Sequence, residues 1–295
     1  MSDCGRHAIT LIAFVGSVFS PYYHWARQRA RRGGPVADAG HHCAINIALY
    51  SPGQKRWTMT ERGRSSVERE ADRFSVGPSE LRWDGAALTL QLRERSAPIP
   101  RAVRGTVRLI PEQLFNWQAP LDAAGRHRWG PLATRARIEV DFEQPGLRWQ
   151  GHGYLDSNEG DEPIEDCFDE WDWSRAVLPD GDSALLYDVR ERSGAEQLLA
   201  LRFGRDGRVT PVEAGPRQAL ATSAWRVRRS IRSDAGTARP RIIRTLEDTP
   251  FYVRSIAESS FAGQIVQSMH ETLSGPRLRS PVVRLMLPWR MPRLP

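Results

Sequence analysis

Apolar and polar residues alternate in short segments along the whole chain, and turn residues separate these segments. A period of two is typical of antiparallel strands that bury one face. Clear examples are residues 43–50, 80–94, 134–143, 196–213 and 250–258. Two of these segments contain Asp-Gly pairs, Asp84-Gly85 and Asp206-Gly207, and each pair predicts a hairpin.

Helical periodicity is weak by comparison. Residues 21–33 and 163–171 are the longest helix candidates, and both open with a proline, which a first helical turn tolerates. We therefore predict an all-β fold of antiparallel strands with few short helices, spaced as in a sandwich or barrel. A closed barrel is favoured because it leaves no exposed sheet edge.

Composition and charge narrow the classes of partner. The chain has 295 residues, of which 40% are hydrophobic, enough to fill sizeable cores. Its net charge of +7 arises from 42 basic and 35 acidic residues, and Lys55 is its one lysine. Arginine fills nearly every basic position, and a GC-rich genome explains this bias. Nucleic-acid binding explains it less well, because the arginines are scattered among acidic residues. We expect no nucleic-acid partner.

The three cysteines, Cys4, Cys43 and Cys167, are an odd number without C-x-x-C spacing. They predict neither a disulfide framework nor a zinc site, and a reducing compartment suits them best. His41 and His42 precede Cys43, but neighbouring strand residues point to opposite faces, so we interpret them as structural. No metal is expected.

The two ends of the chain differ in their apolar patterns. Residues 8–19 are too short a run to cross a bilayer, which needs about 20 residues, and they predict a buried strand instead. We expect no transmembrane helix. Prolines exclude a long helix over residues 279–295. The residues of this tail expected to face lipid are Val282, Leu285, Leu287, Trp289 and Met291, interleaved with Arg284, Arg290 and Arg293. This Arg/Pro-rich amphipathic tail suits a lipid headgroup surface, and the alternative is a tail packed on the protein body.

An acidic run over residues 156–172 contains nine acidic residues and no basic one. The run lacks the alternating oxygen-ligand spacing of a calcium loop, so we interpret residues 159–172 as a solvated connector between the domains that ends in a short helix and holds no metal. The hairpin pattern resumes at Trp171. We therefore expect one domain over residues 1–160 and a second over 161–295, which includes the tail.

The stretch from Trp149 to Gly160 combines aromatic rings, an imidazole and carboxylates. As a strand, it places on one face the residues Gln150, His152, Tyr154, Asp156 and Asn158. This polar face is either the solvent side of an ordinary half-buried strand or a working site.

Long segments of the chain carry a family resemblance. They include "IAFVGSVFSPYYHWA" (12–26), "HHCAINIALY" (41–50), "LDAAGRHRWGP" (121–131), "GYLDSNEGDEPIEDCFDEWDWSRA" (153–176) and "MLPWRMPR" (286–293). Together they resemble the carotenoid 1,2-hydratases, also called hydroxyneurosporene synthases, along nearly the whole chain. The resemblance implies two lipocalin-like antiparallel β-barrel domains in tandem. It also implies a hydro-lyase that uses no cofactor and adds water to the terminal C1–C2 double bond of acyclic carotenes such as neurosporene and lycopene.

One departure from the family pattern concerns the start of the chain. Family members carry an aromatic-rich opening strand with a Trp-Trp-Tyr run ahead of the segment that matches residues 5–17. Here only a few residues precede Ala8, and that strand is absent. We expect either a start codon further upstream or a first barrel that closes without the strand and leaves an edge.

The chemistry of alkene hydration indicates which residues to look for. Protonation at the less substituted carbon gives a tertiary cation, so the site needs a carboxylic acid kept neutral by burial and aromatic faces for the cation. A positioned water then completes the addition. Asp156 is the expected acid, because Leu155 and Ser157 flank it and Tyr154 shares its strand face.

The resemblance places the family's catalytic set on the same residues. Asp156 stands in its G-Y/F-x-D motif as the implied proton donor, and the His-x-Trp pair His127 and Trp129 assists it. Trp129 and Tyr154 are expected to line the cation, while His127 orients water or accepts its proton. The ordinary alternatives are core aromatics for Trp129 and Tyr154 and a turn histidine for His127. We expect the four side chains to converge on one cavity of the N-terminal barrel.

The chief alternative function is a lipocalin-like carrier of a hydrophobic isoprenoid ligand, which needs an apolar cavity but no buried acid. For an enzyme, the partners are an acyclic carotenoid, water and a membrane surface, because a long polyene has almost no aqueous solubility. We expect a cytoplasmic protein that associates peripherally with the inner, photosynthetic membrane. The sequence indicates no oligomeric state.

Overall fold

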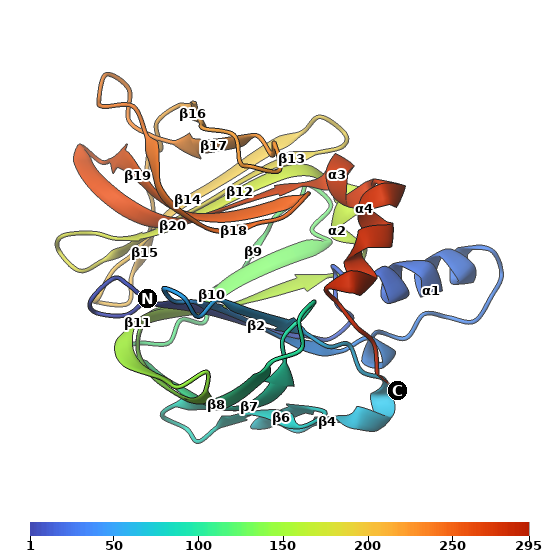
Figure 1. Ribbon diagram of the computed structural model, residues 1–295. Helices are drawn as coiled ribbons and strands as arrows, with labels where there is room; N and C mark the ends of the chain where they lie inside the picture. Colours follow the sequence, from blue (N-terminus) through green and yellow to red (C-terminus); the bar gives the residue numbers. More distant parts are fainter. Residues whose placement is uncertain (295) are drawn as a thin grey trace. The chain divides into compact units, whose positions relative to one another are not determined.

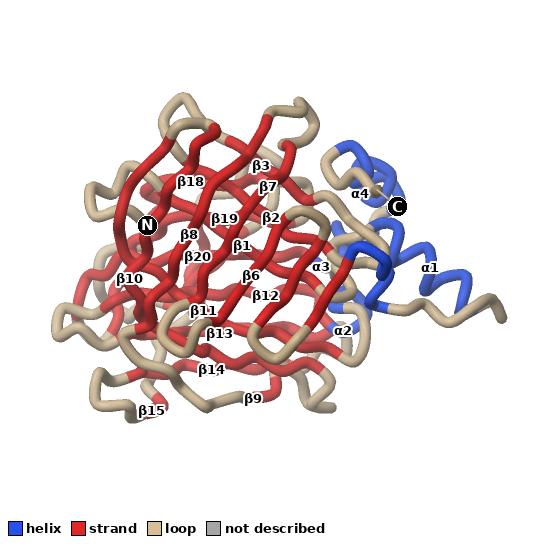
Figure 2. Tube along the Cα trace, turned by 90° about the horizontal axis from the view of Figure 1, so that it is seen from below, coloured by secondary structure: helices blue, strands red, loops and turns tan. Residues whose placement is uncertain are grey.

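Antiparallel strands dominate the computed structural model, which describes residues 1–294 (Figures 1 and 2). The predicted all-β fold with few short helices is confirmed. The chain forms two compact units, each assembled from separate stretches of sequence. Unit 1 contains Met1–Glu112, Arg135–Tyr154 and the chain from Arg284 onward, and unit 2 contains Gln113–Thr134 and Leu155–Val283. The division into domains 1–160 and 161–295 stays a prediction.

Unit 1 contains a three-stranded sheet and most of a larger one. The small sheet has the order β1-β2-β3, with β1 (Ala8–Phe14), β2 (Ala44–Tyr50) and β3 (Arg56–Met59). The larger sheet has the order β11-β10-β8-β7-β6-β5-β4, and β9 pairs with β10. Its strands are β4 (Val67–Arg69), β5 (Arg73–Val76), β6 (Ser79–Trp83), β7 (Leu88–Arg95), β8 (Ala102–Pro111), β9 (Ala119–Pro120), β10 (His127–Gln144) and β11 (Leu147–Gly160). The chain passes between the units along β10 and β11.

Unit 2 is built on a seven-stranded sheet of order β15-β14-β13-β12-β20-β19-β18. Its strands are β12 (Phe168–Val177), β13 (Ser183–Glu191), β14 (Glu196–Phe203), β15 (Val209–Pro211), β18 (Arg241–Asp248), β19 (Tyr252–Phe261) and β20 (Gln264–Ser274). A hairpin of β16 (Arg217–Leu220) and β17 (Arg229–Arg232) lies over this sheet (Figure 1). Leu220 and Ile231 of the hairpin pack against Ala257 of β19, which holds it in place.

Over the described residues, the sheets follow open strand orders and do not close into the barrels that the sequence favoured. In unit 2, both edge strands of the sheet have features that discourage pairing with another chain. Edge strand β15 has three residues, and β18, the other edge, pairs with register shifts at Ile242/Arg244 and Thr245/Glu247. Very short edge strands and bulges discourage pairing with another chain without requiring closure.

Short helices punctuate the strands. They are α1 (Pro21–Arg31), α2 (Ile164–Cys167), α3 (Gly275–Arg279), α4 (Pro281–Met286) and the 3-10 turns η1 (Ala39–His41), η2 (Arg64–Ser66) and η3 (Leu287–Trp289). The helix predicted at 21–33 is confirmed, and its N-cap Ser20 accepts a hydrogen bond from the backbone N–H of Tyr23. Among the described residues no helix combines the length and apolarity needed to span a bilayer.

The helix predicted over residues 163–171 covers only Ile164–Cys167 in the structure. It ends at Cys167, and Phe168 begins β12, which pairs with β13 on one side and β20 on the other. The interpretation of residues 159–172 as a solvated connector is therefore wrong at its C-terminal end. Asp172 lies in this central strand with 5% of its surface exposed.

Both Asp-Gly hairpins are confirmed. Asp84 and Gly85 join β6 to β7, with the Asp84 carboxylate accepting the backbone N–H groups of the next turn residues. Asp206 and Gly207 lie between β14 and β15. Both glycines have positive φ, 94° and 87°, a conformation that glycine adopts without steric cost. The run at 8–19 forms a strand only over Ala8–Phe14, and that strand is mostly half-buried.

Candidate active site

The side chains of Trp129 and Asp156 meet in unit 2. Trp129 lies near the start of β10 and is fully buried, whereas Asp156 lies near the end of β11 and is half-buried. The indole Nε1–H of Trp129 donates a hydrogen bond to Oδ2 of Asp156 over 3.0 Å. The structure thus brings together two of the predicted residues, 27 positions apart in sequence, and holds one carboxyl oxygen against a buried ring.

Strand β11 changes character along its length. Gln150 and His152 are exposed, so its polar face looks to solvent at that end. Tyr154 and Asp156, further along the same face, are partly buried, and the hydroxyl oxygen of Tyr154 is covered. The solvent-facing interpretation therefore describes the first half of the strand and not the second.

His127 is held by hydrogen bonds at both ring nitrogens. Its Nδ1 lies 3.1 Å from Oδ2 of Asp122, and its Nε2 lies 3.2 Å from the carbonyl oxygen of Glu162. The ring is therefore held from two sides. The ring also packs on Phe168, with centroids 4.7 Å apart. This geometry matches the turn-histidine alternative and positions the start of β10.

Asp122 is a site residue that the sequence analysis missed. Its carboxylate accepts backbone N–H groups of the following turn, including those of Arg126 and His127. Burial opposes its ionisation, but these hydrogen bonds prevail and lower the pKa of Asp122. The signal was present in the segment "LDAAGRH", where an aspartate opens a turn that contains glycine.

A cluster of aromatic rings in unit 2 surrounds the Trp129–Asp156 pair. Tyr187 of β13 meets Trp129 edge-on at 5.4 Å and Trp171 at 5.6 Å, and Trp117 meets Trp129 at 5.8 Å. Tyr187 is buried. Burial, with the nearby charges of Asp156 and Glu271, raises the pKa of Tyr187 well above its usual value, so its hydroxyl keeps its proton.

A second buried polar group lies on the opposite face of β12 from Trp171. Asp172 accepts hydrogen bonds from the hydroxyls of Ser230 and Thr272, and His270 Nε2 lies 3.7 Å from its Oδ1. Burial raises the pKa of Asp172 to about 7 and lowers that of His270 to about 3. Because successive residues of a strand face opposite ways, Asp172 points away from Trp171 and this group is separate from the Trp129–Asp156 pair.

Asp122, His127 and Cys167 could together offer a metal three ligand atoms, which lie within 4.8 Å of one another. These three side chains are not in a state that favours binding of a metal ion. Both ring nitrogens of His127 already face acceptors, and burial raises the pKa of the Cys167 thiol to about 12, so the thiol is neutral. The arrangement fits a hydrogen-bonded loop better than a metal centre.

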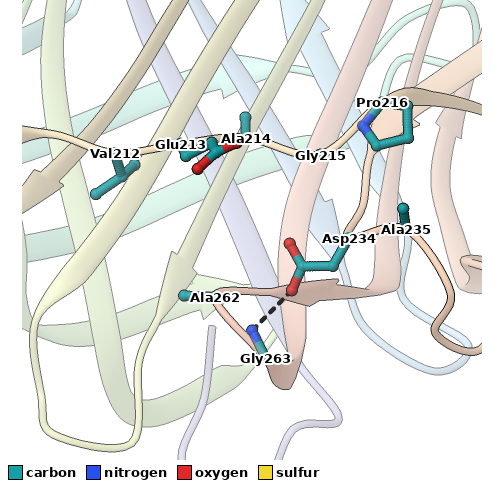
Figure 3. Close-up of a pocket in the computed structure, with 9 residues that line it drawn as sticks. All are labelled: Val212, Glu213, Ala214, Gly215, Pro216, Asp234, Ala235, Ala262 and Gly263. Carbon is teal, nitrogen blue, oxygen red and sulfur yellow. Dashed lines mark hydrogen bonds between the residues drawn. The ribbon is translucent and has the colours of Figure 1, made fainter.

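A pocket of about 550 Å³ lies elsewhere in unit 2 (Figure 3). Its lining is Val212, Glu213, Ala214, Gly215, Pro216, Asp234, Ala235, Ala262 and Gly263. The Asp234 carboxylate is already used there, accepting the Gly263 N–H at 2.7 Å. The lining of this pocket includes none of the four predicted site residues, Asp156, Trp129, His127 and Tyr154. The pocket is therefore not the cavity expected beside the acid.

The fold and the site define a class: an antiparallel β protein that holds a carboxyl group against buried aromatic rings. In fold, the chain is similar to the crystal structure of a putative AttH from Nitrosomonas europaea, with a TM-score of 0.55 and 13% identity over 79% of this chain and 80% of that one. The carotenoid hydratase CrtC family model matches residues 11–295. The chain belongs to this family, which confirms the predicted resemblance.

Curated relatives agree with the family assignment. The chain is 53% identical to the acyclic carotenoid 1,2-hydratase of Rubrivivax gelatinosus, over 99% of this chain and 71% of the relative. It is 52% identical to that of Thiocapsa roseopersicina, over 100% and 71%. Identity to the Cereibacter sphaeroides protein of the same name is 39%, over 97% and 98%.

Proposed function

We propose that this chain is an acyclic carotenoid 1,2-hydratase, which adds water to the terminal C1–C2 double bond of an acyclic carotene and gives a 1-hydroxy carotenoid. The names of its relatives support this function. The observation that carries it is the Trp129–Asp156 hydrogen bond beside buried aromatic rings. Such a site combines a carboxyl group with π faces, the two parts that alkene protonation needs.

In the proposed reaction, neutral Asp156 donates its proton to C2 and the C1–C2 π bond breaks. The positive charge forms at C1, which is tertiary, and the face of Trp129 stabilises it by cation–π attraction of about 1–2 kcal/mol. Water then adds through its oxygen to C1. The proton that this water loses returns to the Asp156 carboxylate, so the acid is regenerated and no cofactor is consumed.

His127 has a supporting role in this scheme. Its ring is fixed by Asp122 and by the Glu162 carbonyl, and it lies two residues before Trp129 on β10. A ring engaged at both nitrogens can orient water through the local field, whereas acceptance of a proton from water requires a ring nitrogen without such a partner. We therefore assign His127 to orientation of the loop and of water.

A non-catalytic carrier of a hydrophobic isoprenoid is the alternative. The experiment that separates the two is incubation of the purified chain with neurosporene or lycopene in phospholipid vesicles, followed by mass spectrometry. A hydratase produces a carotenoid heavier by one water. A carrier binds the polyene and returns it unchanged, and that result would overturn the proposed activity.

We further propose peripheral association with an anionic membrane surface on the cytoplasmic side, through the tail. Leu285 and Trp289 are 72% and 79% exposed. Leu287 and Met291 are buried, so the predicted set of lipid-facing residues is corrected for these two, whose side chains pack inward. Arg284, expected to face lipid headgroups, is buried as well.

The tail from Arg284 onward belongs to unit 1, and contacts of Arg290 and Arg293 hold it there. Arg293 forms an ion pair with the buried carboxylate of Glu61 and donates to the carbonyl oxygen of His41 at 2.9 Å. The guanidinium of Arg290 stacks over the Trp57 ring at 4.3 Å. A firmly held segment that still exposes Leu285 and Trp289 supports insertion of these two side chains into a headgroup layer.

A further inference from the structure

Asp156 accepts a second hydrogen bond on the oxygen that Trp129 holds. The side-chain Nδ2 of Asn158 lies 3.4 Å from Oδ2 of Asp156. On its other side, Oδ1 of Asn158 accepts the hydroxyl of Tyr187, also at 3.4 Å. A path of hydrogen bonds therefore runs from the buried phenol through an exposed amide to the carboxyl group, all within unit 2.

We propose that Tyr187 and Asn158 are positioning residues of the hydration reaction, which together turn the Asp156 carboxyl so that Oδ1 carries and delivers the proton. This inference deepens the proposed function and rests on it. The sequence placed Asn158 on the strand face of Asp156 without assigning it a role, and it did not indicate Tyr187.

The direction of the path follows from the chemistry of its buried end. Tyr187 is buried and retains its hydroxyl proton, so it serves as the donor to Asn158. The amide of Asn158 has one acceptor and one donor side, and with Oδ1 facing Tyr187 its Nδ2 faces Asp156. The phenol thus fixes which way the amide points.

Two N–H donors on Oδ2 determine where the acid carries its proton. Trp129 and Asn158 both direct N–H groups at Oδ2, and a proton on that oxygen would compete with them. In the neutral acid the proton therefore belongs on Oδ1. After transfer to the alkene, the same two N–H groups donate to a charged oxygen, and such bonds are roughly twice as strong as neutral ones. The two bonds therefore strengthen as negative charge develops on Oδ2 in the transition state, and interactions that are stronger there than in the ground state accelerate the step.

Other charged groups face this region from the neighbouring strands. Glu271 of β20 raises the pKa of Tyr187 together with Asp156, and Arg254 of β19 pairs with Glu271 at 2.6 Å. The ring of Tyr187 also packs on Trp129 and Trp171. A test must therefore remove the hydroxyl and keep the ring, which Tyr187→Phe does.

The test is a double-mutant cycle with kcat and KM measured on vesicle-borne neurosporene. Tyr187→Phe and Asn158→Leu are each expected to lower kcat about tenfold, the equivalent of one lost hydrogen bond, with KM unchanged. Because the phenol acts through the amide, the double variant should lose no more than Asn158→Leu alone. Tyr50→Phe, which removes a buried hydroxyl in unit 1, is the matched control and should keep wild-type kcat.

Two results would overturn the inference. One is wild-type kcat in both single variants, and the other is a double variant whose loss is the product of the two single losses. Asn158 is exposed, so Asn158→Leu still tests the path if Tyr187→Phe does not fold. If the wild-type chain makes no hydrated carotenoid, the proposed function fails; if only the variants match wild type, the positioning role alone fails.

Discussion

Trp129 donates its indole N–H to Oδ2 of Asp156 across 3.0 Å, and this bond joins the beginning of β10 to the end of β11. Trp129 is fully buried, so its N–H has no competing water. The indole N–H orients the carboxyl group, and this bond strengthens as negative charge forms on Oδ2 during proton transfer. The bond therefore bears on the geometry of the proposed proton donor and on the charge that it acquires.

Replacement of Trp129 by Phe removes this N–H and retains an aromatic face. We expect kcat for hydration to fall at least tenfold, because the carboxyl loses one of its two Oδ2 donors. Trp149→Phe is the matched control, since the Trp149 indole nitrogen is buried without an acceptor. Equal rates for both variants would show that the Trp129–Asp156 bond does not contribute to catalysis.

Asp172 predicts a specific dependence of stability on pH. Burial raises its folded-state pKa from 3.8 to about 7, so the folded protein keeps a proton that the unfolded chain releases. This contribution to stability is fully present below pH 3.8 and is lost as pH rises through about 7. Relative to Asp172→Asn, the wild type should lose on the order of 4 kcal/mol of unfolding free energy across that interval. Urea unfolding at several pH values measures this, and parallel curves would contradict it.

The cysteines should differ sharply in reactivity. Cys4 is exposed, and hydrogen bonds from Ser2 and Arg6 lower the pKa of its thiol to about 7, whereas burial raises the pKa of Cys167 to about 12. Because the thiolate is the reactive form, iodoacetamide should modify Cys4 first at neutral pH. Peptide mass mapping over time checks the order. Modification of Cys167 in the folded protein at the rate of Cys4 would be the opposite outcome.

The exposed side chains of the tail can be tested without truncation. Leu285→Ser combined with Trp289→Ser should weaken binding to anionic vesicles at least tenfold, since both side chains lose apolar area available to lipid. Leu114→Ser removes a comparably exposed leucine from unit 2 and serves as control. Co-sedimentation at low and high salt is the measurement. Binding that is unchanged in the tail variant would exclude the tail as the membrane contact.

The local sequence pattern was sufficient to predict many of the strands, turns and helices. Alternation predicted β11, the Asp-Gly pairs predicted two hairpins, and Pro21 marked α1. These features depend on residues close in sequence. The helix at 163–171 failed because tertiary pairing of Phe168–Val177 with β13 and β20 outweighed the local helix signal.

Only some residues of the candidate site could be predicted from the sequence. The family resemblance and strand alternation singled out Trp129 and Asp156, which do meet. Asn158 was placed on the strand face of Asp156 but given no role, and Tyr187 reaches the site only because β13 lies in the sheet beside β12. Sequence spacing cannot specify a contact between strands that are distant along the chain.

The hydration of neurosporene by Asp156→Asn is the most direct test of Asp156 as the proton donor. An amide of the same shape cannot deliver the proton, so turnover should fall by about 10²- to 10⁴-fold while carotenoid binding is retained. Asp161→Asn, which removes a nearby exposed carboxylate paired with Arg128, should keep wild-type turnover. Hydrated product formed by Asp156→Asn at the wild-type rate would contradict the assignment of Asp156 as the proton donor.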